Sequence, residues 1–76
     1  MAKLIKEFQV ITSLNTGVKK QAATIYVEEY ATTWRVSAQF IGWACPSALG
    51  WRYTKKECAD KAALIKRFTE EFNATR

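Results

Sequence analysis

The sequence predicts an α+β fold in which a three- or four-stranded antiparallel β-meander is packed by one C-terminal α-helix. Two observations carry this prediction. Residues 4–53 alternate between apolar and polar side chains and are broken by turn signals, which is typical of half-buried antiparallel strands. Residues 54–73 carry apolar side chains at three- and four-residue steps, which indicates an amphipathic helix. With 76 residues, 49% of them hydrophobic, the chain is expected to form a single domain, 1–76.

Three segments alternate clearly enough to be predicted as strands, namely residues 4–14, 22–31 and 34–43. Turn residues at 15–17 separate the first two strands, and the short link at 32–33 suits a hairpin between the second and third. The third segment is the most regular. Its predicted core side chains are Trp34, Val36, Ala38 and Phe40.

A fourth strand is a candidate at Leu49–Tyr53, and the helix is predicted to begin at Thr54. The run from Thr54 to Glu57 fits a capping box, in which the two side chains satisfy free backbone N–H groups at a helix start. The helix is expected to reach about Asn73 and to bury one stripe against the sheet. That stripe consists of Cys58, Ala62, Ile65, Phe68 and Phe72, with Leu64 beside them.

A single helix covers one face of such a sheet, so the other face is expected to be open. Alternation places Tyr26 and Tyr30 on this open face, and Trp43 is a further candidate. Further apolar residues expected there are Ile5, Ile11 and Ile41. Because Tyr and Trp are enriched in protein interfaces, we predict that the three aromatic residues contact a second copy of the chain or another protein. Flanked by cations, they could instead stack on single-stranded bases.

The net charge of +5 favours nucleic acid or an acidic protein surface as partner. The candidate contact residues are Arg52, Lys55, Lys56, Lys19 and Lys20. In a helix that begins at Thr54, Lys55 and Lys56 occupy the first turn, where free N–H groups attract anions and acidic residues are preferred. Replacing both lysines by Glu is therefore expected to leave stability equal or slightly raised. The alternative is that both lysines are ordinary solvated surface.

Several kinds of chemistry are excluded by composition. The chain has no histidine, which removes Ser-His-Asp triads, Cys-His pairs and His-ligated metals. Cys45 and Cys58 lack a C-x-x-C spacing, so a closed zinc site is not expected, and both are predicted to be free thiols. Glu28 and Glu29 are adjacent on a strand and should face opposite sides. We therefore predict a non-enzymatic protein with neither metal nor cofactor.

The first seven residues, Met-Ala-Lys-Leu-Ile-Lys-Glu, lack the apolar core of a signal peptide. No apolar run approaches the roughly 20 residues that span a bilayer. A cytoplasmic protein without a membrane partner is expected, in the host cytoplasm if a phage encodes it.

Residues 50–63 carry a resemblance to a known family. They read Gly-Trp-Arg-Tyr-Thr-Lys-Lys-Glu-Cys-Ala-Asp-Lys-Ala-Ala, which is similar to the last strand and helix start of a double-stranded-RNA-binding domain, G-x-G-x-S-K-K-x-A-K-x-x-A-A. The matching residues are Gly50, Lys55, Lys56, Ala62 and Ala63, with Thr54 and Cys58 as close replacements. The resemblance implies that Lys55 and Lys56 contact phosphates across a groove. The chain departs from the family at residues 4–14, a strand where the family has its first helix, and at residues 31–34, where the G-P-x-H loop is absent.

Two functions are consistent with these features. In size and charge the chain is similar to the small proteins of phages and mobile elements, of which anti-CRISPR inhibitors are one group. By this analogy it is an inhibitor or adaptor that docks on a nucleic-acid-handling protein complex. Since a nucleic-acid mimic would be acidic, a basic inhibitor is expected to bind an acidic or aromatic patch, or to recruit nucleic acid. The alternative is a nucleic-acid-binding module that contacts phosphates through the helix N-terminus.

Overall fold

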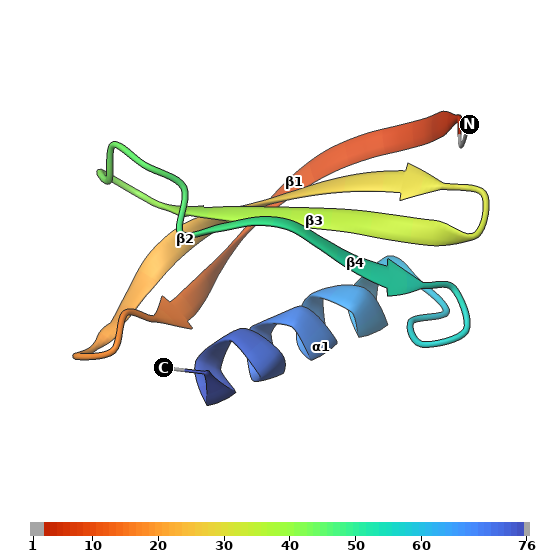
Figure 1. Cartoon of the computed structure of the whole chain (residues 1–76). Coiled ribbons are helices and arrows are strands. Elements are labelled where there is room, and N and C mark those ends of the chain that lie inside the picture. The colour runs from red at the N-terminus through yellow and green to blue at the C-terminus, as the bar shows by residue number, and fades with distance from the viewer. Residues whose placement is uncertain (1–2, 76) are drawn as a thin grey trace.

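Four antiparallel strands and one helix make up the computed structural model, which describes residues 3–75. Strands β1 (Leu4–Asn15), β2 (Lys20–Tyr30), β3 (Thr33–Phe40) and β4 (Ala48–Thr54) form one sheet in the order of the chain. Helix α1 (Lys61–Ala74) follows and packs on one side of this twisted sheet (Figure 1). The α+β meander with a C-terminal helix is confirmed, and the candidate fourth strand is formed.

Glycine-containing turns follow β1 and β3. Between β1 and β2, the Asn15 side chain accepts a hydrogen bond from the Gly17 N–H at 3.0 Å, and Gly17 has a φ of 99°. That backbone conformation is easy only for glycine. Strand β3 ends at Phe40, three residues before the predicted end at residue 43, because the chain turns at Gly42 with a φ of 89°.

The hydrophobic core lies between α1 and the face of the sheet that it covers. On the helix, Leu64, Phe68 and Phe72 are fully buried and recur every four residues, so they share one side. The Phe68 ring lies 5.1 Å from the ring of Trp51, and the Phe72 ring lies 6.1 Å from that of Phe40 (centroid to centroid). These aromatic contacts join the helix to β3 and β4.

The buried stripe differs in part from the predicted one. Phe68 and Phe72 are buried as expected, but Ala62 is exposed and Ile65 is only half-buried. Leu64, in the first turn of α1, is fully buried and belongs to the stripe in place of Ala62. Cys58 is buried as expected, although it precedes the helix.

The predicted helix start at Thr54 is wrong. Thr54 is the last residue of β4, where it pairs with Thr33 of β3. The capping-box hydrogen bonds do form: the Glu57 N–H donates to Thr54 Oγ1 at 3.2 Å, and the Thr54 N–H donates to Glu57 Oε1 at 3.4 Å. They close a turn instead of a helix, because the Lys55 N–H is still bonded to the Thr32 carbonyl at 2.9 Å and holds the chain beside β3.

Asp60 is the N-cap of α1, and its carboxylate accepts a hydrogen bond from the Ala63 N–H at 2.8 Å. We expect Asp60→Ala to lower the free energy of unfolding by about 0.5–2 kcal/mol, because that N–H loses its acceptor. Denaturation with urea measures this. Thr54→Ala is the control and should cost less, because Thr54 is exposed and closes only a turn. A larger loss for Thr54→Ala would contradict this helix start.

Hydrogen bonds fix both ends of the helical segment to the sheet. Before the helix, the Trp34 indole N–H donates to the Cys58 carbonyl at 3.0 Å in a buried position. Near the helix end, the Asn73 side chain accepts from the Asn15 N–H at 2.8 Å. The helix is thereby held on one face of the sheet, and the opposite face is left uncovered.

Candidate functional site on the open face of the sheet

The open face is the side of the sheet turned away from α1. In β2, Ile25 and Val27 are buried in the core, so the alternating residues Thr24, Tyr26 and Glu28 lie on the open face. The strand register aligns such residues into rows that cross the sheet. The predicted orientation of Tyr26, opposite to Ile25 and Val27, is confirmed.

One row of the open face consists entirely of charged residues, and we call it the charged row. Glu7 of β1 is opposite Glu28 of β2, Glu28 is opposite Arg35 of β3, and Arg35 is opposite Arg52 of β4. The order across the sheet is acid, acid, base, base. The central neighbours attract, with Arg35 Nη1 3.5 Å from Glu28 Oε1. The two outer neighbour pairs carry like charges, which destabilises a sheet.

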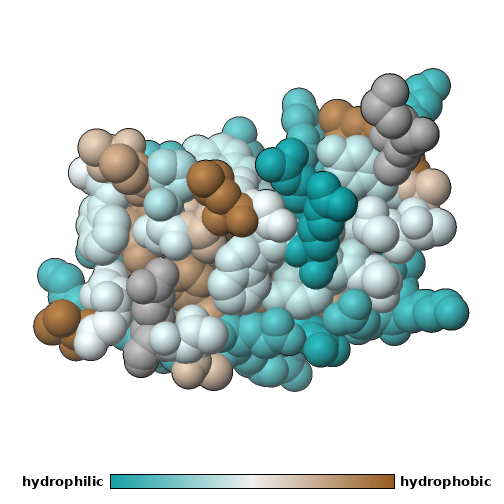
Figure 2. All heavy atoms as spheres, in the orientation of Figure 1, coloured by the Kyte–Doolittle hydropathy of each residue, from teal (hydrophilic) through white to brown (hydrophobic). Residues whose placement is uncertain are grey.

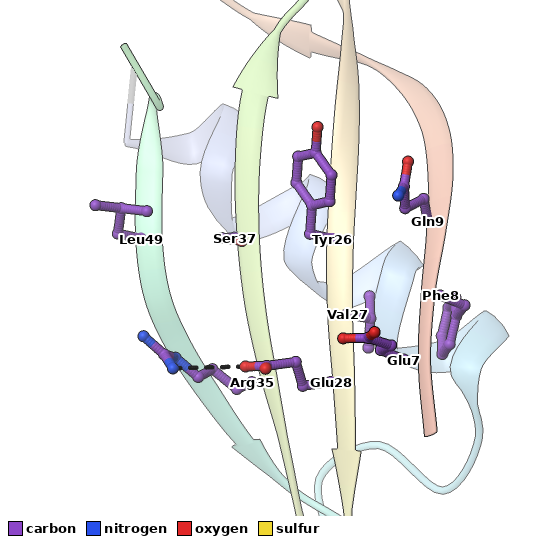
Figure 3. A pocket seen from close by; sticks show the side chains of 9 residues that line it. All are labelled: Glu7, Phe8, Gln9, Tyr26, Val27, Glu28, Arg35, Ser37 and Leu49. Carbon is purple, nitrogen blue, oxygen red and sulfur yellow. Dashed lines mark hydrogen bonds and ion pairs between the residues drawn. The ribbon is translucent and has the colours of Figure 1, made fainter. Parts of the chain in front are cut away.

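A hollow of about 700 Å³ extends across the open face, lined by residues of all four strands, including Glu7, Glu28 and Arg35 of the charged row. Tyr26 and Leu49 stand on either side of the short Ser37 side chain, and the Glu28–Arg35 ion pair lies at one end (Figure 3). The register shifts opposite Ser37, because the two residues at 49–50 of β4 face this one position in β3. Such a bulge bends the strand locally.

Apolar side chains also stand on this face. Tyr26 is 39% exposed, and Ile11 and Leu49 are each 68% exposed. Figure 2, in the orientation of Figure 1 with α1 in view, shows hydrophobic side chains interspersed among hydrophilic ones. On the open face, Tyr26, Ile11 and Leu49 lie among the charged row and other polar side chains. This mixture is typical of non-obligate protein interfaces, whose overall polarity is close to that of the remaining surface.

The three predicted interface aromatics do not form one cluster. Tyr26 is central on the open face. Tyr30 is half-buried at one end of the sheet, where it pairs with Leu4 of β1. Trp43 lies in the turn beyond β3, at the other end, and its ring is 4.8 Å from that of the core residue Phe40. Trp43 therefore borders the core side of the sheet and does not share the open face with Tyr26.

The five cations predicted to contact anions are also dispersed. Lys19 and Lys20 are exposed at the β1–β2 turn, at the opposite end of the sheet from Lys55 and Lys56 (Figure 1). Arg52 is exposed in the charged row. Lys55 and Lys56 lie in the turn after β4, not in the first turn of the helix. The expected cluster of lysines around the free N–H groups of a helix is therefore wrong.

Lys55 and Lys56 have different surroundings. The Lys55 ammonium lies 2.6 Å from Glu29 Oε2 and 4.2 Å from the ring centroid of Trp34, whereas Lys56 is exposed. We expect Lys55→Glu to lower the free energy of unfolding by about 1–2 kcal/mol, because it removes both contacts and sets a carboxylate beside Glu29. This changes the expectation that both lysines can be reversed without loss.

Lys56→Glu is the matched control, and we expect it to change the free energy of unfolding by less than about 0.5 kcal/mol. Thermal melts of the two single variants separate the roles. Equal stability of both variants would show that the Glu29 and Trp34 contacts do not stabilise the fold.

Within residues 3–75, no three Cys, Asp, Glu or His side chains come together as a metal-binding group. Cys45 is exposed, Cys58 is buried, and both are free thiols as predicted. Burial raises the pKa of the Cys58 thiol, which keeps it protonated. Glu28 and Glu29 face opposite sides of the sheet, as predicted.

Within the described residues 3–75, no helix is long and apolar enough to cross a membrane.

Sequence reasoning missed the charged row. The link between β2 and β3 is residues 31–32, and counting outward from it places Glu28 opposite Arg35. The predicted link at 32–33 is wrong by one residue and would have placed Glu28 opposite Ser37. The positions of Glu7 and Arg52 in the same row depend on the β1–β2 register and on the bulge in β4. Neither is visible in the residue pattern.

Comparisons of this chain with protein-family models, with curated proteins and with solved structures found no match.

Proposed function

We propose that this protein is a small, basic, non-enzymatic binding protein that docks on another protein through the open face of its sheet. The observation that carries the proposal is the uncovered face itself, which combines the charged row with a hollow between Tyr26 and Leu49. A polar face with a few apolar and aromatic anchors is suited to a reversible protein contact.

The proposed partner is a nucleic-acid-handling protein complex, and the proposed role is that of an inhibitor or adaptor of the anti-CRISPR kind. Two features support this choice. The net charge of +5 favours association with complexes that are rich in acidic or phosphate groups. The small size and the two-layer fold, one sheet covered by one helix, suit a protein that acts by occupying a surface.

Site-specific photocrosslinking tests the proposal. A photoreactive amino acid replaces Leu49 on the open face, and in a control chain it replaces Lys66, which is exposed on α1. We expect a nuclease-resistant adduct with a foreign protein from the Leu49 position and none from Lys66. The same adduct from both positions, or none from Leu49, would contradict docking through the open face.

Nucleic-acid binding is a second candidate, and one observation favours it. Arg35 and Arg52 are direct neighbours on β3 and β4, and Lys56 lies exposed in the turn that follows. Together they form a cationic margin along β4. In this case Arg52→Glu with Lys56→Glu should weaken binding to RNA and reduce its salt dependence by about one phosphate contact per residue. The resemblance of residues 50–63 to a double-stranded-RNA-binding domain points to the same margin and belongs to this proposal.

A further inference from the structure

The charged row has an order that a second copy of the same chain complements. Read from β1 to β4 it is acid, acid, base, base, formed by Glu7, Glu28, Arg35 and Arg52. Within one chain this order is unfavourable, because two of its three neighbour pairs carry like charges. Read in reverse, it is base, base, acid, acid. A row that faces its own reverse therefore has an opposite charge at every position.

From this complementarity we propose that the open face binds a second copy of the chain, related by a two-fold axis that runs parallel to the strands between β2 and β3. Rotation about this axis lays β1 over the partner's β4 and β2 over the partner's β3. Glu7 then faces Arg52 of the other copy, and Glu28 faces Arg35. A two-fold axis along the row itself would instead set each charge against its own copy. Isologous pairing of this kind is the commonest symmetry of homo-oligomers.

The hollow fits the same arrangement. Tyr26 is one row away from Glu28 on β2, and its neighbour on β3 is Ser37. The rotation that pairs the charged rows also sets Tyr26 of each copy over Ser37 of the other. The space between Tyr26 and Leu49 can receive that ring, because the Ser37 side chain is short (Figure 3). Aligned sheets whose facing side chains interdigitate are a common packing of two sheets.

The area of the open face indicates how tightly the two copies should bind each other. Four strands about 4.8 Å apart and about eight residues long, at about 3.3 Å per residue, offer about 500 Å² of flat area. Two such faces give about 1,000 Å², at the low end for specific protein interfaces. The dimer is thus expected to exchange with monomers. This inference rests on the use of the open face as a docking surface, as in the proposed function, and a foreign partner at the same face must displace the second copy.

Two variants of identical net charge test the pairing. Glu28→Arg with Arg35→Glu, the matched variant, gives a row of acid, base, acid, base, which still complements its own reverse. Glu28→Arg with Arg52→Glu, the mismatched variant, gives acid, base, base, acid, in which every charge faces a like charge. Both variants have fewer like-charged neighbours within one chain than the wild type, so neither is expected to lose its fold. Thermal melts check this.

Sedimentation of the purified chain over a concentration series measures the dimer. We expect the wild type and the matched variant to dimerise and the mismatched variant to bind itself about tenfold or more weakly, because opposed like charges suppress association. Concentration-dependent amide NMR shifts of the wild type should centre on Tyr26 and Ser37 and spare the outer side of α1.

A monomeric wild type, or a mismatched variant that dimerises like the wild type, would overturn the proposal. Photocrosslinking at Leu49 separates this result from failure of the proposed function. If the chain is monomeric but still forms the foreign adduct, only the dimer proposal is wrong. If the chain dimerises but forms no foreign adduct, the proposed docking function is wrong and the dimer proposal stands.

Discussion

Phe68→Ala is expected to lower the free energy of unfolding by about 3–5 kcal/mol. Phe68 is fully buried in the middle of α1, and its ring packs on those of Trp51 and Phe72. Truncation removes the ring contact with Trp51, which helps to join the helix to β4, and leaves a cavity. A domain of this size has a total stability of about 4–11 kcal/mol, so the loss is a large fraction of the whole.

Urea denaturation followed by tryptophan fluorescence measures the effect of Phe68→Ala. Leu49→Ala is the matched control, because Leu49 is also a large apolar residue but is 68% exposed on the open face. We expect the control to change the free energy of unfolding by less than about 0.5 kcal/mol. A small loss for Phe68→Ala would mean that the helix is not anchored through this ring.

Tyr53→Phe is expected to destabilise the protein at neutral pH and to flatten the loss of stability in alkali. Tyr53 is buried, and its hydroxyl donates to Glu71 Oε2 at 3.0 Å. Arg67 holds the same carboxylate, with Nε 2.7 Å from Oε1. Removing the hydroxyl deletes a hydrogen bond to a charged group, which is worth about 1.5–3 kcal/mol.

The alkaline effect follows from the direction of the pKa shift. Burial, and then the hydrogen bond to the Glu71 carboxylate, raise the pKa of Tyr53 well above its ordinary value of 10.0. A raised pKa in the folded state gives stability that is present below pH 10.0 and is lost as the pH rises further, because only the unfolded chain then ionises this hydroxyl. Phenylalanine has no hydroxyl proton, so this contribution to the loss of folding stability at high pH should be absent from the Tyr53→Phe variant.

Urea denaturation at neutral and at alkaline pH, for the wild type and Tyr53→Phe, measures both effects. The raised pKa of Cys58 adds an alkaline loss of the same sign, but that residue is present in both chains, so the difference between them isolates Tyr53. Parallel pH profiles of the two chains would contradict the assigned role of the hydroxyl.

Local patterns were sufficient for most of the fold. Period-two alternation located the strands because a half-buried strand shows its two faces directly in the residue order. It placed Tyr26 on the face opposite to Ile25 and Val27 without any knowledge of the neighbouring strands. The chain has no histidine, and its two cysteines lack a C-x-x-C spacing. These two facts of the sequence limited the kinds of catalytic and metal-binding site that we predicted.

The helix start could not be located in this way, because the same four residues satisfy two structures. Thr54 and Glu57 exchange the hydrogen bonds of a capping box, yet they close a turn at the end of β4. The pairing of Thr54 with Thr33 decides between the two, and that contact joins residues far apart in sequence. Because the helix was predicted to begin at Thr54, Lys55 and Lys56 were assigned to its first turn, and an anion-binding site was predicted there.

The sequence by itself determined which residues of β2 and β3 face the core and which face outward, since that property depends on neighbours along the chain. Only the tertiary structure decided which outward residues share a row. Glu7, Glu28, Arg35 and Arg52 are spread over 46 positions and come together through three strand registers and one bulge. Register is set by turn geometry and by packing of the opposite face, so a surface built across strands is invisible to any pattern read along one of them.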